Sequence, residues 1–102
     1  MTITIEYEGQ PLAVQATEIV PGLFVHKTPH GNYSVVHGNS GLAVATLIDR
    51  RNQAVLFASK AGLLIDWLGD DEASIERQVV RLGLVSELRR LQTKARERLL
   101  VP

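Results

Sequence analysis

The chain contains no cysteine. It therefore cannot form a disulfide bond, supply a thiolate nucleophile or hold a metal ion through sulfur. A chain without cysteine suits a reducing compartment, and we expect this protein to be cytoplasmic. No apolar run approaches the roughly 20 residues of a membrane-spanning helix, and the first ten residues lack the basic start and apolar block of a signal peptide. We therefore expect no membrane partner.

The sequence also has no excess of charge. Its 102 residues include 11 basic and 11 acidic side chains, so the formal net charge at pH 7 is +0. The total charge thus gives no indication of binding to a polyanion. A hydrophobic content of 45% and a charged content of 22% are ordinary for a globular protein. We predict one small α+β domain over residues 1–102.

The first half of the chain predicts strands. Apolar and polar side chains alternate strictly in residues 2–8, as in a strand with one buried face. The connections between such runs are turn-rich and too short for crossovers, which predicts an antiparallel meander of four to five strands. The last run is nearly all apolar, so we expect a central strand or one directly under a helix. The predicted strands cover about residues 2–8, 12–17, 22–27, 33–37 and 42–48.

The middle of the chain predicts one amphipathic helix over about residues 50–68, packed on this sheet. Asp49 stands where a helix cap is favoured, and Gly69 stands where a helix ends. Apolar residues recur at the spacing that keeps them on one side of a 3.6-residue helix. These residues are Ala54, Phe57, Ala58, Ala61, Leu64, Ile65 and Leu68.

A second apolar face is expected on the same helix. Leu56, Leu63 and Trp67 lie roughly half a turn from the main stripe, because each helical residue turns by about 100°. A helix that is apolar on two sides needs two partners. The sheet is one of them. The C-terminal segment, a second copy of the chain or a foreign protein is the other, and the C-terminal segment is favoured because neighbouring elements usually pack together.

The C-terminal part predicts one or two further helices, over about residues 72–82 and 85–99. The apolar stripe changes phase at Gly83, which favours two helices over a single bent one. In the second helix Leu84, Leu88 and Leu91 share one face.

The residues suited to chemistry are few. His26, His30 and His37 fall close together, but a hairpin between them points His26 and His37 to opposite faces of the sheet, so we predict no metal site. Ser40 follows His37 closely, yet a serine–histidine pair needs a third, orienting group and an oxyanion hole. We therefore predict no catalytic residue, no cofactor and no enzymatic activity.

The leading hypothesis is a small non-enzymatic protein-interaction or regulatory module that binds another protein or itself as a homo-oligomer. Aromatic anchors on a rigid helix are typical of such contacts. The predicted interface residues are Leu56, Leu63, Trp67, Leu84, Leu88 and Leu91.

The alternative is a nucleic-acid-binding accessory protein, because basic residues gather near the C-terminus and suit a phosphate backbone. The predicted contact residues are Arg89, Arg90, Lys94, Arg96 and Arg98. The exposed face of an ordinary amphipathic helix also explains these charges.

Overall fold

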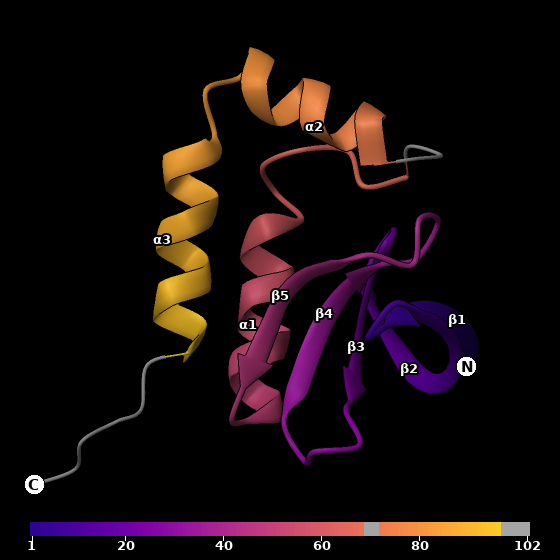
Figure 1. Cartoon of the computed structure of the whole chain (residues 1–102). Coiled ribbons are helices and arrows are strands. Elements are labelled where there is room, and N and C mark those ends of the chain that lie inside the picture. The colour runs from indigo at the N-terminus through magenta and orange to yellow at the C-terminus, as the bar shows by residue number, and fades with distance from the viewer. Residues whose placement is uncertain (69–71, 97–102) are drawn as a thin grey trace, which may run out of the picture.

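The computed structural model of the protein (Figure 1) describes residues 1–68 and 72–96. Five strands precede three helices, which confirms the predicted α+β class. None of the helices within these residues combines the length and the apolar content needed to cross a bilayer. The elements are β1 (Thr2–Tyr7), β2 (Gln10–Val20), β3 (Leu23–Lys27), β4 (Tyr33–His37), β5 (Ala43–Ile48), α1 (Arg51–Ala61), α2 (Glu72–Arg81) and α3 (Val85–Arg96).

The five strands form one antiparallel sheet in the order β1-β2-β3-β4-β5, so the predicted meander is confirmed. The β2 strand is longer than predicted and runs through Gln10–Val20, because its first part pairs with β1 and its second part pairs with β3. The connection from β1 to β2 is a two-residue turn in which Glu8 and Gly9 both have positive φ. This combination is the turn geometry that matches the twist of a hairpin.

The sheet curls so that β1 approaches the turn between β4 and β5. The N–H of Glu6 donates to the carbonyl of Gly41 at 2.9 Å. A Cβ added at Gly41 would lie 3.2 Å from the carbonyl oxygen of Thr4, so the close approach favours glycine there. A small apolar cluster lies inside the curl. Its buried members are Ile5, Ala16, Phe24 and Val36.

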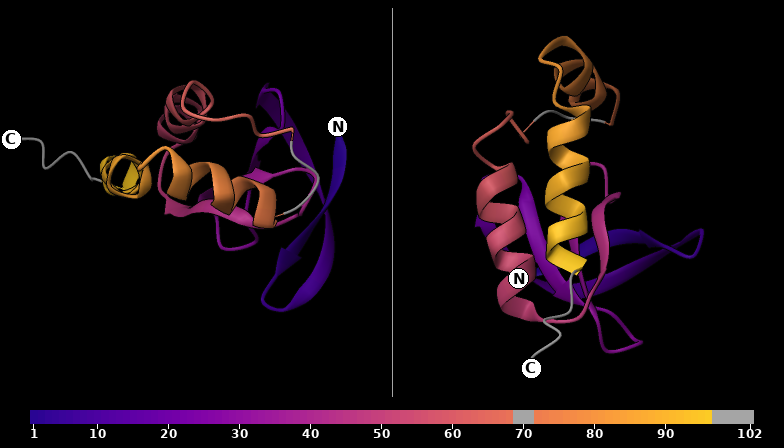
Figure 2. Two further views of the ribbon diagram at one scale, coloured as in Figure 1. Left: turned by 90° about the horizontal axis from the view of Figure 1, so that it is seen from above. Right: turned by 90° about the vertical axis from the view of Figure 1, so that its left-hand side faces the viewer.

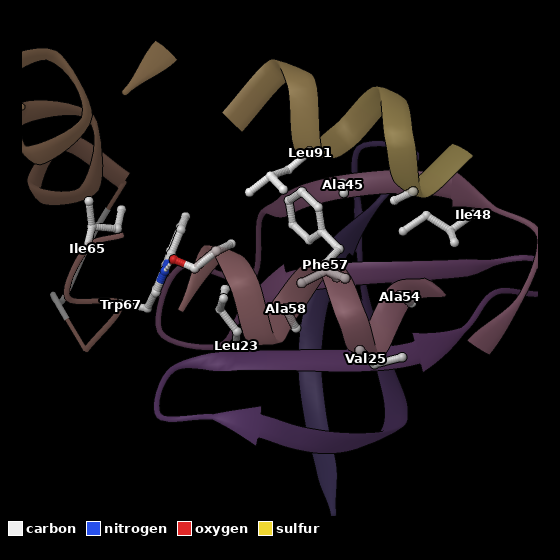
Figure 3. Close-up of a cluster of buried hydrophobic side chains, with 13 residues drawn as sticks. Leu23, Val25, Ala45, Ile48, Ala54, Phe57, Ala58, Ile65, Trp67 and Leu91 are labelled. Carbon is white, nitrogen blue, oxygen red and sulfur yellow. Dashed lines mark hydrogen bonds between the residues drawn. The ribbon is translucent and has the colours of Figure 1, made fainter. Parts of the chain in front are cut away.

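The main core lies on the opposite face of the sheet, under α1 (Figure 3). Helix α1 contacts β3, β4 and β2, and its predicted apolar stripe faces the sheet. The buried residues of this stripe within the helix are Ala54, Phe57, Ala58 and Ala61. Small alanines allow the helix to lie close to the sheet, while Phe57 fills the space toward α3.

Helix α1 is shorter than predicted. It ends at Ala61, where Gly62 takes the C-cap and its N–H donates to the carbonyl of Ala58 at 2.9 Å. The N-cap residue is Arg50 rather than Asp49, and Arg50 makes no capping hydrogen bond through its side chain. The predicted stop at residue 69 lies outside the described residues.

The segment after α1 turns back because this path buries Trp67. The indole is only 3% exposed, and its Nε1–H donates to the carbonyl of Ala61 at 2.9 Å. Burying a side chain of this size contributes about 3 kcal/mol, whereas helix propensities differ by only about 0.7 kcal/mol per residue. The periodicity of residues 62–68 therefore gave the wrong local structure, although it identified Ile65 correctly as buried.

Strand β5 is the last strand of the sheet, which excludes the predicted central position and leaves the other predicted arrangement, a strand packed under a helix, since β5 contacts α1 and α3. Helix α3 lies beside it and beside α1, as the views in Figure 2 show. Two side chains of α3 hydrogen-bond the carbonyls of this edge. Gln92 Nε2 donates to the carbonyl of Val44 at 2.6 Å, and Arg96 Nε donates to that of Thr46 at 2.9 Å. The buried side chains of β5 are Ala45 and Ile48, which belong to the main core, whereas Leu47 is 65% exposed.

The C-terminal helices confirm the predicted break at Gly83, which has a φ of 66° between α2 and α3. A single bent helix is thereby ruled out. The described part of α3 ends at Arg96, so the predicted continuation to residue 99 lies outside the described residues.

Candidate functional site

The structure separates the six predicted interface residues into two groups. Leu56 is 51% exposed and Leu63 is 87% exposed, so these two remain on the surface. Trp67 is buried in the core, which corrects the prediction that it shares an outer helix face with them. The three C-terminal leucines face inward: Leu91 of α3 is buried, and Leu88 of α3 and Leu84, just before this helix, pack against the main core. Helix α3 packs beside α1, but it does not cover the predicted second face, because Leu56 and Leu63 remain exposed and Trp67 lies in the core.

A shallow groove of about 160 Å³ remains between α1 and α3. Its apolar lining consists of Leu56, Phe57, Leu91 and Ala95. Lys60 and Lys94 also line it, and both are exposed. An apolar floor beside two ammonium groups suits an apolar side chain that has a carboxylate close to it.

The turn that follows α1 presents such a combination. Leu63 projects from this turn, and Asp66 is exposed three residues later. Gln78 of α2 holds the turn through two hydrogen bonds to the backbone of Asp66, each 2.9 Å long. The Asp66 carboxylate accepts the N–H of Leu68 at 2.9 Å. The exposed leucine and the carboxylate are thus carried on a braced segment.

Two basic residues of α3, Arg90 and Arg96, make hydrogen bonds within the molecule. Arg90 pairs with Glu87 one helical turn away, and the hydrogen bond between them lowers the pKa of the Glu87 carboxyl and raises that of the Arg90 guanidinium. Arg96 is held on the β5 edge and Lys94 lines the groove. Arg89 is exposed, and residue 98 lies outside the described residues.

The two buried histidines lie on opposite faces of the sheet, as predicted. In the β3–β4 hairpin His26 pairs with Ser34 and His37 pairs with Leu23. His26 lines a hollow of about 240 Å³ inside the curl of the sheet. Burial lowers the pKa of its imidazole and outweighs the opposing hydrogen bond to the Lys27 carbonyl.

His30 lies at the mouth of the same hollow, 3.5 Å from Glu8, and both side chains are largely exposed. Within residues 1–68 and 72–96 no three histidine or acidic side chains gather closely enough to hold a metal ion.

His37 has an unusual environment. Its Nδ1 is 2.8 Å from Ser40 Oγ, but its Nε2 is buried and has no hydrogen-bond partner among the described residues. Such an unsatisfied group costs about 1–3 kcal/mol. The Ser40–His37 pair that the spacing brought into consideration therefore forms, yet no carboxylate in the described structure orients the far side of the ring. The pair lacks that element of a nucleophilic site.

His37 and Ser40 line a pocket of about 430 Å³ between β5, α2 and α3. Most of the other lining side chains are apolar, among them Trp67, Val79 and Leu88, while Glu76 and Gln92 are polar. Sequence reasoning missed this pocket because its walls come from β4, β5, α2 and α3, which are distant from one another in the sequence.

Comparison of the chain with known protein families, curated proteins and solved structures finds no match.

Proposed function

We propose that this protein is a small protein-interaction module that associates with a second copy of itself through the groove between α1 and α3. The observation that supports this function is the joint presence of a groove with two lysines and an exposed leucine near a carboxylate. In this proposal the chain is a cytoplasmic binding protein that needs no cofactor and catalyses no reaction.

The proposed contact is reciprocal. Leu63 of each copy enters the groove of the other copy, and Asp66 approaches Lys60 or Lys94 of that copy. Because each chain carries both the projecting leucine and the groove, a two-fold axis satisfies both halves at once. Opposite charges beside the apolar contact favour one orientation of the two chains over others.

The strength of this contact follows from the exposed area. Complete burial of a leucine contributes about 1.5–3 kcal/mol, so covering the exposed parts of Leu56 and Leu63 gains about 3 kcal/mol per copy. The loss of translational and rotational freedom costs at least about 4 kcal/mol. The two leucines of both copies together therefore leave at most about 2 kcal/mol, and a dimer that forms at about 1 mM, which needs about 4 kcal/mol, requires the contacts of Asp66 with the lysines to supply the remaining amount of about 2 kcal/mol.

Sedimentation or light scattering over a concentration series tests the proposal. The wild-type protein is expected to shift from monomer to dimer, and Leu63→Asn and Leu56→Asn are expected to remain monomeric. Leu47→Asn is the matched control, because Leu47 is 65% exposed but lies on β5, outside the groove. A wild-type protein that stays monomeric throughout, or a control that dissociates as readily as Leu63→Asn, would refute self-association.

Nucleic-acid binding is the second candidate, and one feature of α3 favours it. Arg89, Arg90 and Lys94 line a shallow depression on the exposed side of this helix, together with Ser86 and Thr93. Phosphate contacts made by such residues weaken steeply as salt rises. Retention on single- and double-stranded DNA and on RNA at low salt, lost in Arg89→Gln, would support this function. Absence of retention at low salt would exclude it.

A further inference from the structure

Two polar side chains that are almost completely buried line the hollow inside the curl of the sheet. His26 is 3% exposed and Ser34 is 6% exposed, and the two residues pair across β3 and β4. Side chains alternate along a strand, so His26 lies on the same face as Phe24. For the same reason Ser34 lies on the face of Val36. Phe24 and Val36 belong to the apolar cluster inside the curl, and both polar side chains line the hollow of about 240 Å³ beside this cluster.

Each of these two side chains has a polar atom that is open to the hollow. Within residues 1–68 and 72–96, neither Nε2 of His26 nor Oγ of Ser34 has a hydrogen-bond partner. Of the described side chains that are not exposed, only that of His37 has a fully buried nitrogen or oxygen without a partner. The unpartnered atoms of His26 and Ser34 are therefore not fully buried, and the hollow is the open space that both side chains line.

The Nε2 atom of His26 offers a lone pair to this space. Its Nδ1 lies 3.3 Å from the Lys27 carbonyl, and a carbonyl oxygen can only accept, so Nδ1 carries the proton. Burial lowers the pKa of the imidazole, which favours its neutral form. A neutral imidazole has one N–H, so Nε2 is an acceptor. The buried end of the hollow therefore suits a ligand that donates hydrogen bonds.

The charges around the hollow favour a cationic donor. Its lining includes the acidic residues Glu6 and Glu8 and no described lysine or arginine. The Glu8 carboxylate is 72% exposed and lies 3.5 Å from His30 Nε2 at the mouth, and His30 is charged only when it is protonated. A negative mouth attracts a cation and repels an anion.

We propose that the hollow inside the curl binds a short-chain primary ammonium compound whose N–H groups donate to Nε2 of His26 and Oγ of Ser34. An ammonium group has three donors and no acceptor, which matches these two atoms. The alkyl chain of the ligand contacts the apolar part of the lining, which includes Ile5, Val36 and Leu47. Pockets for drug-sized ligands measure about 300–1,000 Å³, so a hollow of about 240 Å³ suits a smaller molecule. The inference uses no residue of the α1–α3 groove and does not depend on self-association.

A comparison of butylammonium, butanol and butyrate holds the alkyl chain constant while the head group changes. Nuclear magnetic resonance titration measures binding through the backbone signals of His26 and Ser34. Butylammonium is expected to shift these signals with a dissociation constant on the order of 1 mM. Butanol donates one hydrogen bond without a charge and is expected to bind several-fold more weakly, and butyrate is expected to leave the signals unchanged. Butanol that binds as tightly as butylammonium, or failure of butylammonium to shift these signals, would overturn the proposal.

Glu8→Gln and Glu76→Gln are matched variants, because both remove an exposed carboxylate but only Glu8 lines the hollow. Glu8→Gln is expected to weaken butylammonium binding about two- to fivefold and to leave butanol binding unchanged. Glu76→Gln is expected to change neither. Equal effects of the two substitutions on butylammonium would contradict a contribution from the mouth of the hollow.

His26→Leu and His37→Leu test the buried acceptor, since both histidines are 3% exposed but lie on opposite faces of the sheet. Loss of the acceptor in His26→Leu is expected to weaken butylammonium binding about tenfold, whereas His37→Leu is expected to leave it unchanged. Ser34→Ala is the milder variant and is expected to weaken binding about fivefold. An unaltered affinity in His26→Leu or in Ser34→Ala would refute the proposed contacts.

A nitrogen-15 spectrum of the histidine rings tests the same proposal in the wild-type protein, even where His26→Leu does not fold. Protonated and bare imidazole nitrogens have well-separated chemical shifts. A bare Nε2 of His26 whose resonance moves on addition of butylammonium is the expected result. A proton on this Nε2 at neutral pH would remove the acceptor on which the site depends.

Discussion

Replacement of Trp67 by alanine tests the path of the chain after α1. The indole is 3% exposed, belongs to the main core and donates its Nε1–H to the carbonyl of Ala61. Truncation of a buried tryptophan costs about 3–5 kcal/mol. A domain of this size has about 5–15 kcal/mol of stability, so Trp67→Ala is expected to remove a large part of it.

A graded series separates packing from hydrogen bonding at this position. Trp67→Phe keeps an aromatic ring but removes the donor, and the expected loss is about 1–2 kcal/mol. The Ala61 carbonyl still accepts the N–H of Leu64 at 3.1 Å, so it is not left unpaired. A loss of 1 kcal/mol lowers the melting temperature of a 100-residue domain by about 4 °C, so Trp67→Phe is expected to melt about 4–8 °C below the wild type.

Leu63→Ala is the control, because Leu63 is 87% exposed and lies only four residues before Trp67 in the sequence. An exposed substitution of this kind is expected to change the free energy of unfolding by no more than about 0.5 kcal/mol. Thermal and urea unfolding followed by circular dichroism measures all three variants without depending on tryptophan fluorescence. If Trp67→Ala were as stable as Leu63→Ala, the indole would not be in the core, and the predicted long helix with Trp67 on its outer face would regain support.

Three further predictions concern backbone, charge and edge. Urea denaturation is expected to show a far larger loss of stability in Gly22→Ala than in Gly83→Ala, although both glycines have positive φ. A Cβ at Gly22 would lie 2.3 Å from the Trp67 carbonyl oxygen, whereas a Cβ at Gly83 would meet no atom within 4 Å. The cost at Gly83 is therefore only the backbone strain of about 1 kcal/mol. Because burial lowers the pKa of His26 from 6.5, the unfolded chain takes up the proton first as pH falls. The stabilisation of the folded state by the neutral imidazole is thus complete above about pH 6.5 and decreases below this pH. The urea midpoints of unfolding at about pH 8 and about pH 5.5 should therefore differ less in His26→Gln than in the wild type. The double variant Gln92→Ala, Arg96→Ala removes the side chains of α3 that hydrogen-bond two β5 carbonyls. Light scattering is expected to show faster aggregation of this variant than of Arg89→Ala, whose side chain makes no such contact. Equal rates would show that α3 does not protect this edge of the sheet.

Local patterns were sufficient for most of the elements. Strict alternation and short turn-rich connections predicted the meander, and the change of phase at Gly83 predicted two C-terminal helices. The pairing of His26 with Ser34 and of His37 with Leu23 followed from the symmetry of a hairpin about its turn. These features depend on residues close together in the sequence, where the backbone has few alternatives.

The errors arose where distant segments compete for the same side chain. Apolar residues at helical spacing in 62–68 fit a helix and a returning loop equally well. Only the place left for Trp67 against Ala61 and Gly22 distinguishes the two. Likewise, the apolar sequence of β5 indicates burial without showing whether a strand or a helix covers it. Helix α3 lies beside this strand, and its Gln92 and Arg96 hydrogen-bond two of the strand's carbonyls.

Neighbouring residues alone were thus enough to specify an antiparallel sheet, a helix over it and a divided C-terminal segment, because period and turn chemistry act within a few bonds. The folded chain was needed to reveal the α1–α3 groove, the buried Trp67 and the unpaired nitrogen of His37. Each of these features depends on which surfaces are buried and which remain exposed once all the elements have packed together. Contacts between residues far apart in the sequence decide that outcome, and no short stretch of the chain encodes them.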